Sequence, residues 1–164
     1  MIVKGIEYED FVNYRTACMF IMTSRCTFKC DAECGRQVCQ NSELANAPDI
    51  EVNINEVINR YRGDSLTRAI VFGGLEPIDS FEDVYEFIRT LRQVFFCKDM
   101  VVIYTGYNED EIPEQISRLQ EFPNIIVKFG RFIPDDIPYW NELLGVKLAS
   151  SNQYARLISN EDTD

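Results

Sequence analysis

The stretch Ala69-Ile70-Val71-Phe72-Gly73-Gly74-Leu75-Glu76-Pro77 contains the pattern that decides the fold class. Its first four residues are apolar, which is typical of a strand buried on both faces of a parallel sheet. The glycine pair then ends the strand and lets the backbone approach a ligand closely, and Pro77 holds the chain rigid just after the Glu76 carboxylate. Taken alone, such a segment is more often a simple strand-to-helix turn, so its meaning depends on the rest of the chain.

Short apolar segments alternate with amphipathic segments on both sides of this stretch. The pattern predicts further strands over residues 17–23, 100–104 and 125–128, and helices over residues 53–63, 80–95 and 109–122. Asn53 with Glu56, and Ser80 with Asp83, have the spacing of helix capping boxes. Strands that alternate with helices predict an α/β fold with a mainly parallel sheet and right-handed crossovers.

Four chain segments fall at the carboxyl ends of the predicted parallel strands, where such sheets bind ligands. They are a cysteine-rich loop after residues 17–23, the segment 73–77, Thr105-Gly106-Tyr107, and Lys128. We therefore expect one site built from all four. Lys128 could equally be a solvated strand end, and a short strand is possible near residues 154–158.

Composition narrows the classes of function. The chain has 27 acidic and 16 basic residues and a formal charge of -11, whereas a surface that tracks phosphates needs the opposite excess, so nucleic acid is not expected as a partner. No apolar run has the length of a membrane span and the first residues are interrupted by charges, so we expect a cytoplasmic protein with no membrane partner. We expect residues 1–160 to form one domain and the acidic tail 161–164 to be disordered.

Six cysteines in a chain without histidine direct attention to sulfur-based metal chemistry. Four of them, Cys26, Cys30, Cys34 and Cys39, lie close together in the predicted loop. Four thiolates can hold a structural zinc ion, whereas three thiolates on an iron-sulfur cubane leave one iron open to another ligand. The cysteines alone favour neither metal over the other.

Three other side chains are assigned to packing. Cys18 lies in a predicted buried strand and Cys97 follows an apolar helical face, so we expect both to be ordinary core or near-surface thiols. Trp140 follows Tyr139 in an irregular segment flanked by prolines, where the pair could pack on the core or offer a surface to a partner. We expect packing.

The combination of motifs resembles the radical S-adenosylmethionine (SAM) superfamily, and within it the anaerobic ribonucleotide reductase activating proteins. Cys26-Thr27-Phe28-Lys29-Cys30 is similar to the first CxxxC of the superfamily, and Cys39-Gln40-Asn41-Ser42 to the stretch that begins at its third cysteine. Gly73-Gly74-Leu75-Glu76-Pro77 is similar to the SAM-binding GGxEP motif, Tyr104-Thr105-Gly106-Tyr107 to a YTGY segment, and Ser150-Ser151-Asn152-Gln153 to a carboxyl-terminal SSNQ of the reductase activases. The motifs occur in the family's order over nearly the whole chain.

One departure from the family concerns the spacing of the cysteines. The family has CxxxCxxC, but three residues separate Cys30 from Cys34 here and eight separate Cys30 from Cys39. The resemblance after Cys39 indicates that Cys26, Cys30 and Cys39 are the cluster ligands, with Cys34 as the alternative third ligand. The segment 127–132 also lacks an Asp-Gly that many reductase activases carry, which leaves the substrate open.

The resemblance implies a small partial (βα) barrel or an open, mainly parallel sheet that binds a 4Fe-4S cluster and SAM. Gln40, Asn41, Gly73, Gly74, Glu76, Pro77, Thr105 and Lys128 would form the SAM site. Glu76 and the glycine backbone would receive the methionine ammonium, Thr105 would lie near the ribose, and Lys128 would meet the carboxylate or the ribose. The implied enzyme takes an electron from an external donor, cleaves SAM, and makes a glycyl radical on a partner, which is anaerobic ribonucleotide reductase. The alternatives are a stand-alone enzyme that modifies another peptide and a non-catalytic four-cysteine metal module that binds a partner.

Overall fold

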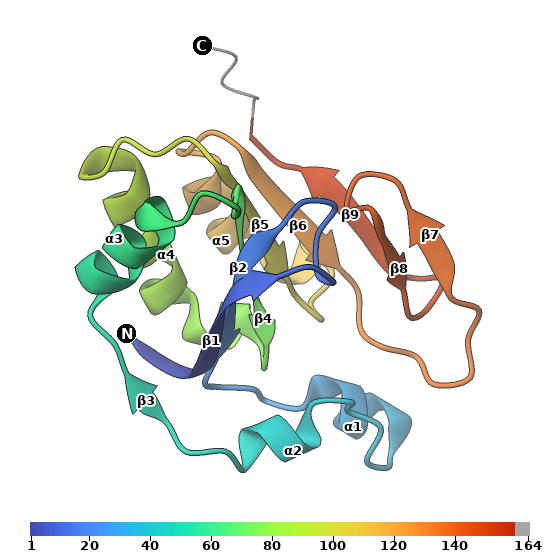
Figure 1. The fold of residues 1–164 in the computed structure, drawn as a ribbon. Helices are drawn as coiled ribbons and strands as arrows, with labels where there is room; N and C mark the ends of the chain where they lie inside the picture. Colours follow the sequence, from blue (N-terminus) through green and yellow to red (C-terminus); the bar gives the residue numbers. More distant parts are fainter. Residues whose placement is uncertain (160–164) are drawn as a thin grey trace.

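Four parallel strands form the centre of the computed structural model, which describes residues 1–159. They are β2 (Cys18–Thr23), β4 (Ala69–Gly74), β5 (Met100–Tyr104) and β6 (Ile125–Phe129). They lie side by side in the order in which they occur in the chain (Figure 1). Each strand is an apolar run, as expected for a sheet that is covered on both faces.

Antiparallel strands extend this centre on both sides. β1 (Ile2–Asp10) pairs with β2 and β3 (Ile50–Glu51) pairs with β1, whereas β9 (Tyr154–Leu157) pairs with β6. The seven-stranded sheet thus runs from β3 to β9, and among the residues described its two edges do not join. The fold is therefore an open α/β sheet with a parallel centre, which is one of the two architectures expected from the sequence.

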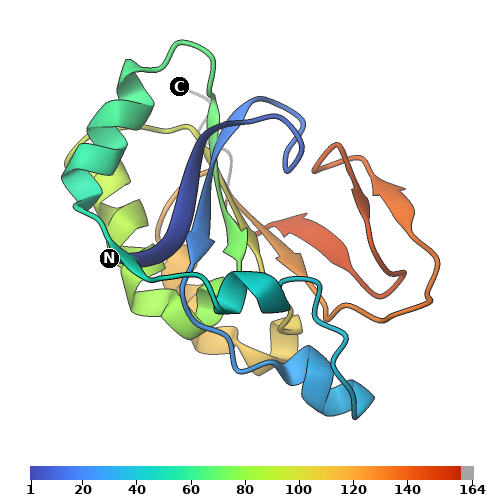
Figure 2. The ribbon, with the colours of Figure 1, turned by 60° about the horizontal axis from the view of Figure 1, so that its bottom comes forward.

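The three main helices all cover the same face of the sheet, as Figure 2 shows. They are α3 (Ile54–Gly63), α4 (Phe81–Gln93) and α5 (Pro113–Leu119), with 3-10 turns η1 (Pro77–Ser80) and η2 (Glu109–Glu111) before the last two. Because the parallel strands are added in one direction, right-handed crossovers place every connecting helix on one side. No described helix has the length and apolar character that a membrane span needs.

The opposite face is covered by a hairpin and a loop instead of helices. β7 (Tyr139–Asn141) and β8 (Val146–Leu148) form the hairpin, and Leu148 packs with Tyr14 of the β1–β2 loop against Val71 and Val102 of the sheet. Strands of three residues give little periodicity, which explains why the sequence pattern did not predict them.

The cysteine segment between β2 and β3 contains two short helices, α1 (Lys29–Cys34) and α2 (Ser42–Ala45). Neither helix buries a side chain. This segment lies along one end of the sheet (Figure 1), and polar contacts dominate its attachment.

Two details of the predicted helices are wrong. Ser80 does not cap α4 in a capping box with Asp83: its hydroxyl has no hydrogen-bond partner, and Asp83 accepts instead from Ile2 N at 3.1 Å. Residues 77–80 form a 3-10 turn capped by Glu76, so the helical segment begins one turn earlier than expected. The helix expected over residues 109–122 is divided because the ring of Pro113 keeps Ile112 outside helical geometry.

The packing predicted for Trp140 is also wrong. Its side chain is 57% exposed, because it points away from the sheet on a strand of alternating burial, whereas Tyr139 donates its hydroxyl to Gln153 O.

Cys18 is fully buried and Cys97 is partly buried against the core, as expected. The predicted acidic tail, 161–164, lies outside the described residues.

The aromatic pair Phe72 and Phe87 joins the sheet to α4 at the centre of the main core. Their rings meet edge to face at 5.3 Å between centroids, and both side chains are fully buried. We expect Phe87→Ala to lower the free energy of unfolding by about 3–5 kcal/mol, because it leaves a cavity between helix and sheet. Urea denaturation measures the change. Phe11→Ala, at a side chain that is 65% exposed, is the control and should change stability by less than about 0.5 kcal/mol.

Candidate functional site

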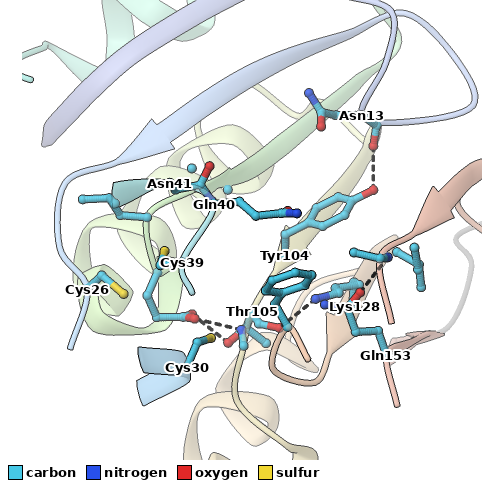
Figure 3. Close-up of a pocket in the computed structure, with 18 of the residues that line it drawn as sticks. Asn13, Cys26, Cys30, Cys39, Gln40, Asn41, Tyr104, Thr105, Lys128 and Gln153 are labelled. Atoms are coloured by element: carbon cyan, nitrogen blue, oxygen red, sulfur yellow. Dashed lines mark hydrogen bonds between the residues drawn. The ribbon is translucent and has the colours of Figure 1, made fainter. Parts of the chain in front are cut away.

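A pocket of about 460 Å³ lies at the carboxyl ends of the parallel strands, beside the cysteine segment (Figure 3). It brings together ten of the residues predicted from the sequence: Cys26, Cys30, Cys39, Gln40, Asn41, Gly73, Gly74, Glu76, Thr105 and Lys128. Two predicted residues do not line it. Pro77 is buried behind Glu76 as the first residue of η1, and Cys34 is exposed at the end of α1.

Three thiols therefore share the pocket and the fourth does not. Cys26 lies in the loop before α1 and accepts a hydrogen bond from Phe28 N at 3.2 Å, Cys30 lies on α1, and Cys39 lies beyond α1 (Figure 3). Cys39 therefore lies with Cys26 and Cys30 whereas Cys34 does not, and the choice of Cys39 as third ligand stays a prediction.

Burial disfavours the thiolate forms of Cys26 and Cys30. It raises the pKa of Cys26 to about 12, and the negative charges of Glu76 and Asp79 add to the rise. Burial also raises the pKa of Cys30. Because a metal takes thiolates, assembly of a metal centre here must release protons from these side chains.

The Glu76 carboxylate is buried and ties neighbouring strand ends together. One oxygen accepts from Ile78 N at 3.0 Å and from the Thr105 hydroxyl at 2.6 Å, and the other accepts from Gly106 N at 2.8 Å. Burial raises the pKa of Glu76, and these three donors oppose the rise. Thr105 thus acts on Glu76 directly, a contact that the sequence did not indicate.

Lys128 is buried, with 7% of its surface exposed, so a solvated strand end is wrong. Its ammonium donates to Gly130 O at 3.0 Å and lies 3.5 Å from Thr105 O. Burial lowers the pKa of Lys128 to about 8, against the attraction of Glu76. A cation with two carbonyl partners keeps a third N–H for an anionic group in the pocket (Figure 3).

The glycine pair is required by space and by backbone geometry. A Cβ on Gly73 would lie 2.8 Å from the ring of Phe20, and Gly74 has a φ of +81°. Both residues therefore let the end of β4 come close to β2 and to α2. The close approach of this backbone to a ligand stays a prediction.

The four residues Ser150-Ser151-Asn152-Gln153 support the loop after β6. The amide of Gln153 donates to Gly130 O at 3.3 Å and that of Asn152 to Arg131 O at 2.8 Å. Arg131 in turn forms an ion pair with Glu111 of η2 and with Glu33 of α1, the latter at 2.9 Å. The carboxyl-terminal motif is thereby connected to the cysteine segment, and no sequence motif indicated this connection.

Most of the far wall of the pocket was not predicted from the sequence. It contains Asn13 of the β1–β2 loop, Tyr104, and residues 146–149 at β8. Tyr104 donates its hydroxyl to Asn13 O at 2.7 Å, which attaches the β1–β2 loop to the end of β5 (Figure 3). Neither the loop nor the hairpin has a motif, so only the three-dimensional arrangement brings them to the site.

Within residues 1–159, no three Cys, Asp or Glu side chains are gathered as a single metal ion needs. A family model described as a 4Fe-4S single cluster domain matches residues 14–145, which is well over half of the chain. The chain belongs to this 4Fe-4S single cluster family. Searches of curated proteins and of solved structures found no match.

The site fits the cluster of the 4Fe-4S single cluster family. Cysteine thiolates are its natural ligands, and three of them line one pocket that has further space beside them. Cys26, Cys30 and Cys39 would hold the cluster. Such an iron-sulfur domain is consistent with redox activity.

We expect Cys26→Ala, Cys30→Ala and Cys39→Ala each to prevent stable cluster assembly, because each removes one of the thiols that line the pocket. Cys34→Ala should keep most of the cluster, since its side chain is exposed outside the pocket. Iron and sulfide per chain after anaerobic reconstitution measure the effect, with Cys97→Ala as the control. A cluster that survives the loss of Cys39 but not that of Cys34 would make Cys34 the third ligand.

Proposed function

We propose that this 4Fe-4S protein is a radical SAM activase that makes a glycyl radical on a partner enzyme, anaerobic ribonucleotide reductase. The observation that carries the proposal is the pocket itself, which is lined both by three thiols and by the first four residues of the GGxEP segment. Three thiol ligands leave one iron of a cubane free for a substrate. The pocket volume lies within the range of about 300–1,000 Å³ that is common for small-molecule sites.

When bound, the cluster and SAM supply a one-electron cleavage of the sulfonium to methionine and a 5'-deoxyadenosyl radical, which takes a hydrogen atom from glycine. The residues of the chain bind and orient the cofactor. Glu76 uses three acceptor positions internally, and a carboxylate has about four, so one remains for the methionine ammonium. Lys128 has a free N–H for the carboxylate or the ribose of SAM.

The far wall of the pocket favours a peptide segment of a large partner as the second substrate. Asn13 and residues 146–149 line the pocket away from the cysteines, so space continues beyond the predicted SAM site. Exposed apolar side chains occur near this end, at Phe11 and Val12 of the β1–β2 loop and at Trp140 of the hairpin. A partner that covers these side chains would exclude water from the radical.

Anaerobic reconstitution followed by reaction with dithionite and SAM tests the proposal, with 5'-deoxyadenosine as the measured product. We expect its formation by the wild-type protein, and none from Cys39→Ala. With the correct partner present, electron paramagnetic resonance should show a glycyl doublet. Cleavage of SAM without a radical on a glycyl-radical enzyme would indicate a stand-alone peptide-modifying enzyme, and uptake of zinc without iron would indicate a non-catalytic metal module.

We expect Glu76→Gln to weaken SAM binding without removing the cluster, because the neutral amide cannot form a charge-assisted hydrogen bond with the ammonium. A bond of that kind contributes roughly 1.5–3 kcal/mol, which corresponds to about a ten- to hundredfold loss of affinity. Equilibrium dialysis with reconstituted protein measures binding, and iron content is the control for the cluster. Unchanged affinity at full iron content would restrict Glu76 to its structural contacts.

A further inference from the structure

The eight residues between Cys30 and Cys39 are closed into a loop by one carboxylate. Asp31, the residue after Cys30, accepts with a single oxygen from Val38 N at 2.7 Å and from Cys39 N at 2.8 Å. These hydrogen bonds therefore connect the two ends of the loop directly. One end follows Cys30 and the other includes the backbone of Cys39, and both cysteines are predicted ligands.

The path of the chain between Cys30 and Cys39 explains how the second cysteine comes back beside the first. α1 continues to Cys34, and Gly35 ends it with a φ of +66° while its N–H donates to Ala32 O at 3.4 Å. A left-handed glycine turns the chain after the helix without steric cost. The insertion thus forms one helical turn and a return segment, with Cys34 exposed at its tip and Cys39 back beside Cys30.

We propose that Asp31 is a positioning residue for the iron-sulfur cluster: its two hydrogen bonds hold the Cys39 backbone so that the thiol faces the pocket of Cys26 and Cys30. A loop of eight residues has many more conformations than the two residues of the family spacing, and one fixed conformation has to be selected among them. The proposal concerns the cluster alone and holds whether or not the protein cleaves SAM.

A simpler role for Asp31 would be the favourable charge of an acidic residue in the first turn of a helix. Glu43 provides a matched comparison, because it is the acidic residue in the first turn of α2, in the same segment. Glu43 is exposed. Among the described residues, no backbone amide of the loop donates to its side chain, whereas Val38 N and Cys39 N both donate to Asp31. Of these two acidic residues, Asp31 is the one that combines the charge with a contact to the backbone of a predicted ligand.

The experiment compares Asp31→Ala, Asp31→Asn and Glu43→Ala after anaerobic reconstitution. Iron and sulfide per chain, the rate of cluster loss to a chelator, and the electron paramagnetic resonance spectrum of the reduced cluster are the measurements. We expect Asp31→Ala to lose its cluster about ten- to a hundredfold faster, as when outer partners of metal ligands are removed. Asp31→Asn keeps an acceptor oxygen and should remain within a few fold of wild type, and Glu43→Ala should match wild type.

Three outcomes would overturn the proposal. Equal loss in Asp31→Ala and Asp31→Asn would assign the effect to charge, and equal behaviour of Asp31→Ala and Glu43→Ala would assign it to the helix terminus. Urea denaturation of the cluster-free proteins provides the control for folding, and the three variants should share the midpoint of wild type, since the loop lies outside the hydrophobic core. A lowered midpoint for Asp31→Ala alone would make its role structural and would also contradict the proposal.

Discussion

The buried carboxylate of Glu76 is the constraint on which the site depends. Burial of a charge costs several kcal/mol unless donors surround it. Here two of the three donors, Thr105 and Gly106, lie directly after β5. The backbone N–H of Glu76 also donates to Arg25 O at 2.8 Å, and Arg25 directly precedes Cys26. One residue therefore fixes the spacing between the end of β4, the end of β5 and the beginning of the cysteine segment, and the position of the thiols follows from that spacing.

The order of the strands has a second effect on the site. Because the parallel strands follow one another in one direction, all crossover helices lie on one face, and the other face stays free of them. The β7–β8 hairpin and the β1–β2 loop occupy that free face, and their ends form the far wall of the pocket. The hairpin belongs to the site through the topology of the sheet, although it contributes none of the recognised motifs.

The four central parallel strands and the residues at their ends could be predicted because each depends on local information, whereas β1 was not predicted. Residues 100–104 form β5 as expected, and Thr105 and Lys128 reach the pocket because strand ends of a parallel sheet meet at one edge. Contacts between distant segments could not be predicted, such as those of Asp83 with the first strand and of Arg131 with α1. The exposed position of Trp140 depends on a hairpin of three-residue strands, which is too short to show a period.

The cysteine segment differs from the rest of the molecule in what holds it. Its two helices bury no side chain, whereas the sheet and α3 to α5 share a continuous apolar core. A unit with few apolar contacts opens at a much lower free energy than the global unfolding of the protein. Hydrogen exchange in the cluster-free protein would thus be fast in residues 29–45 and slow in the central strands. The polypeptide can therefore complete its sheet first and receive iron and sulfide afterwards, through a segment that opens while the scaffold stays folded.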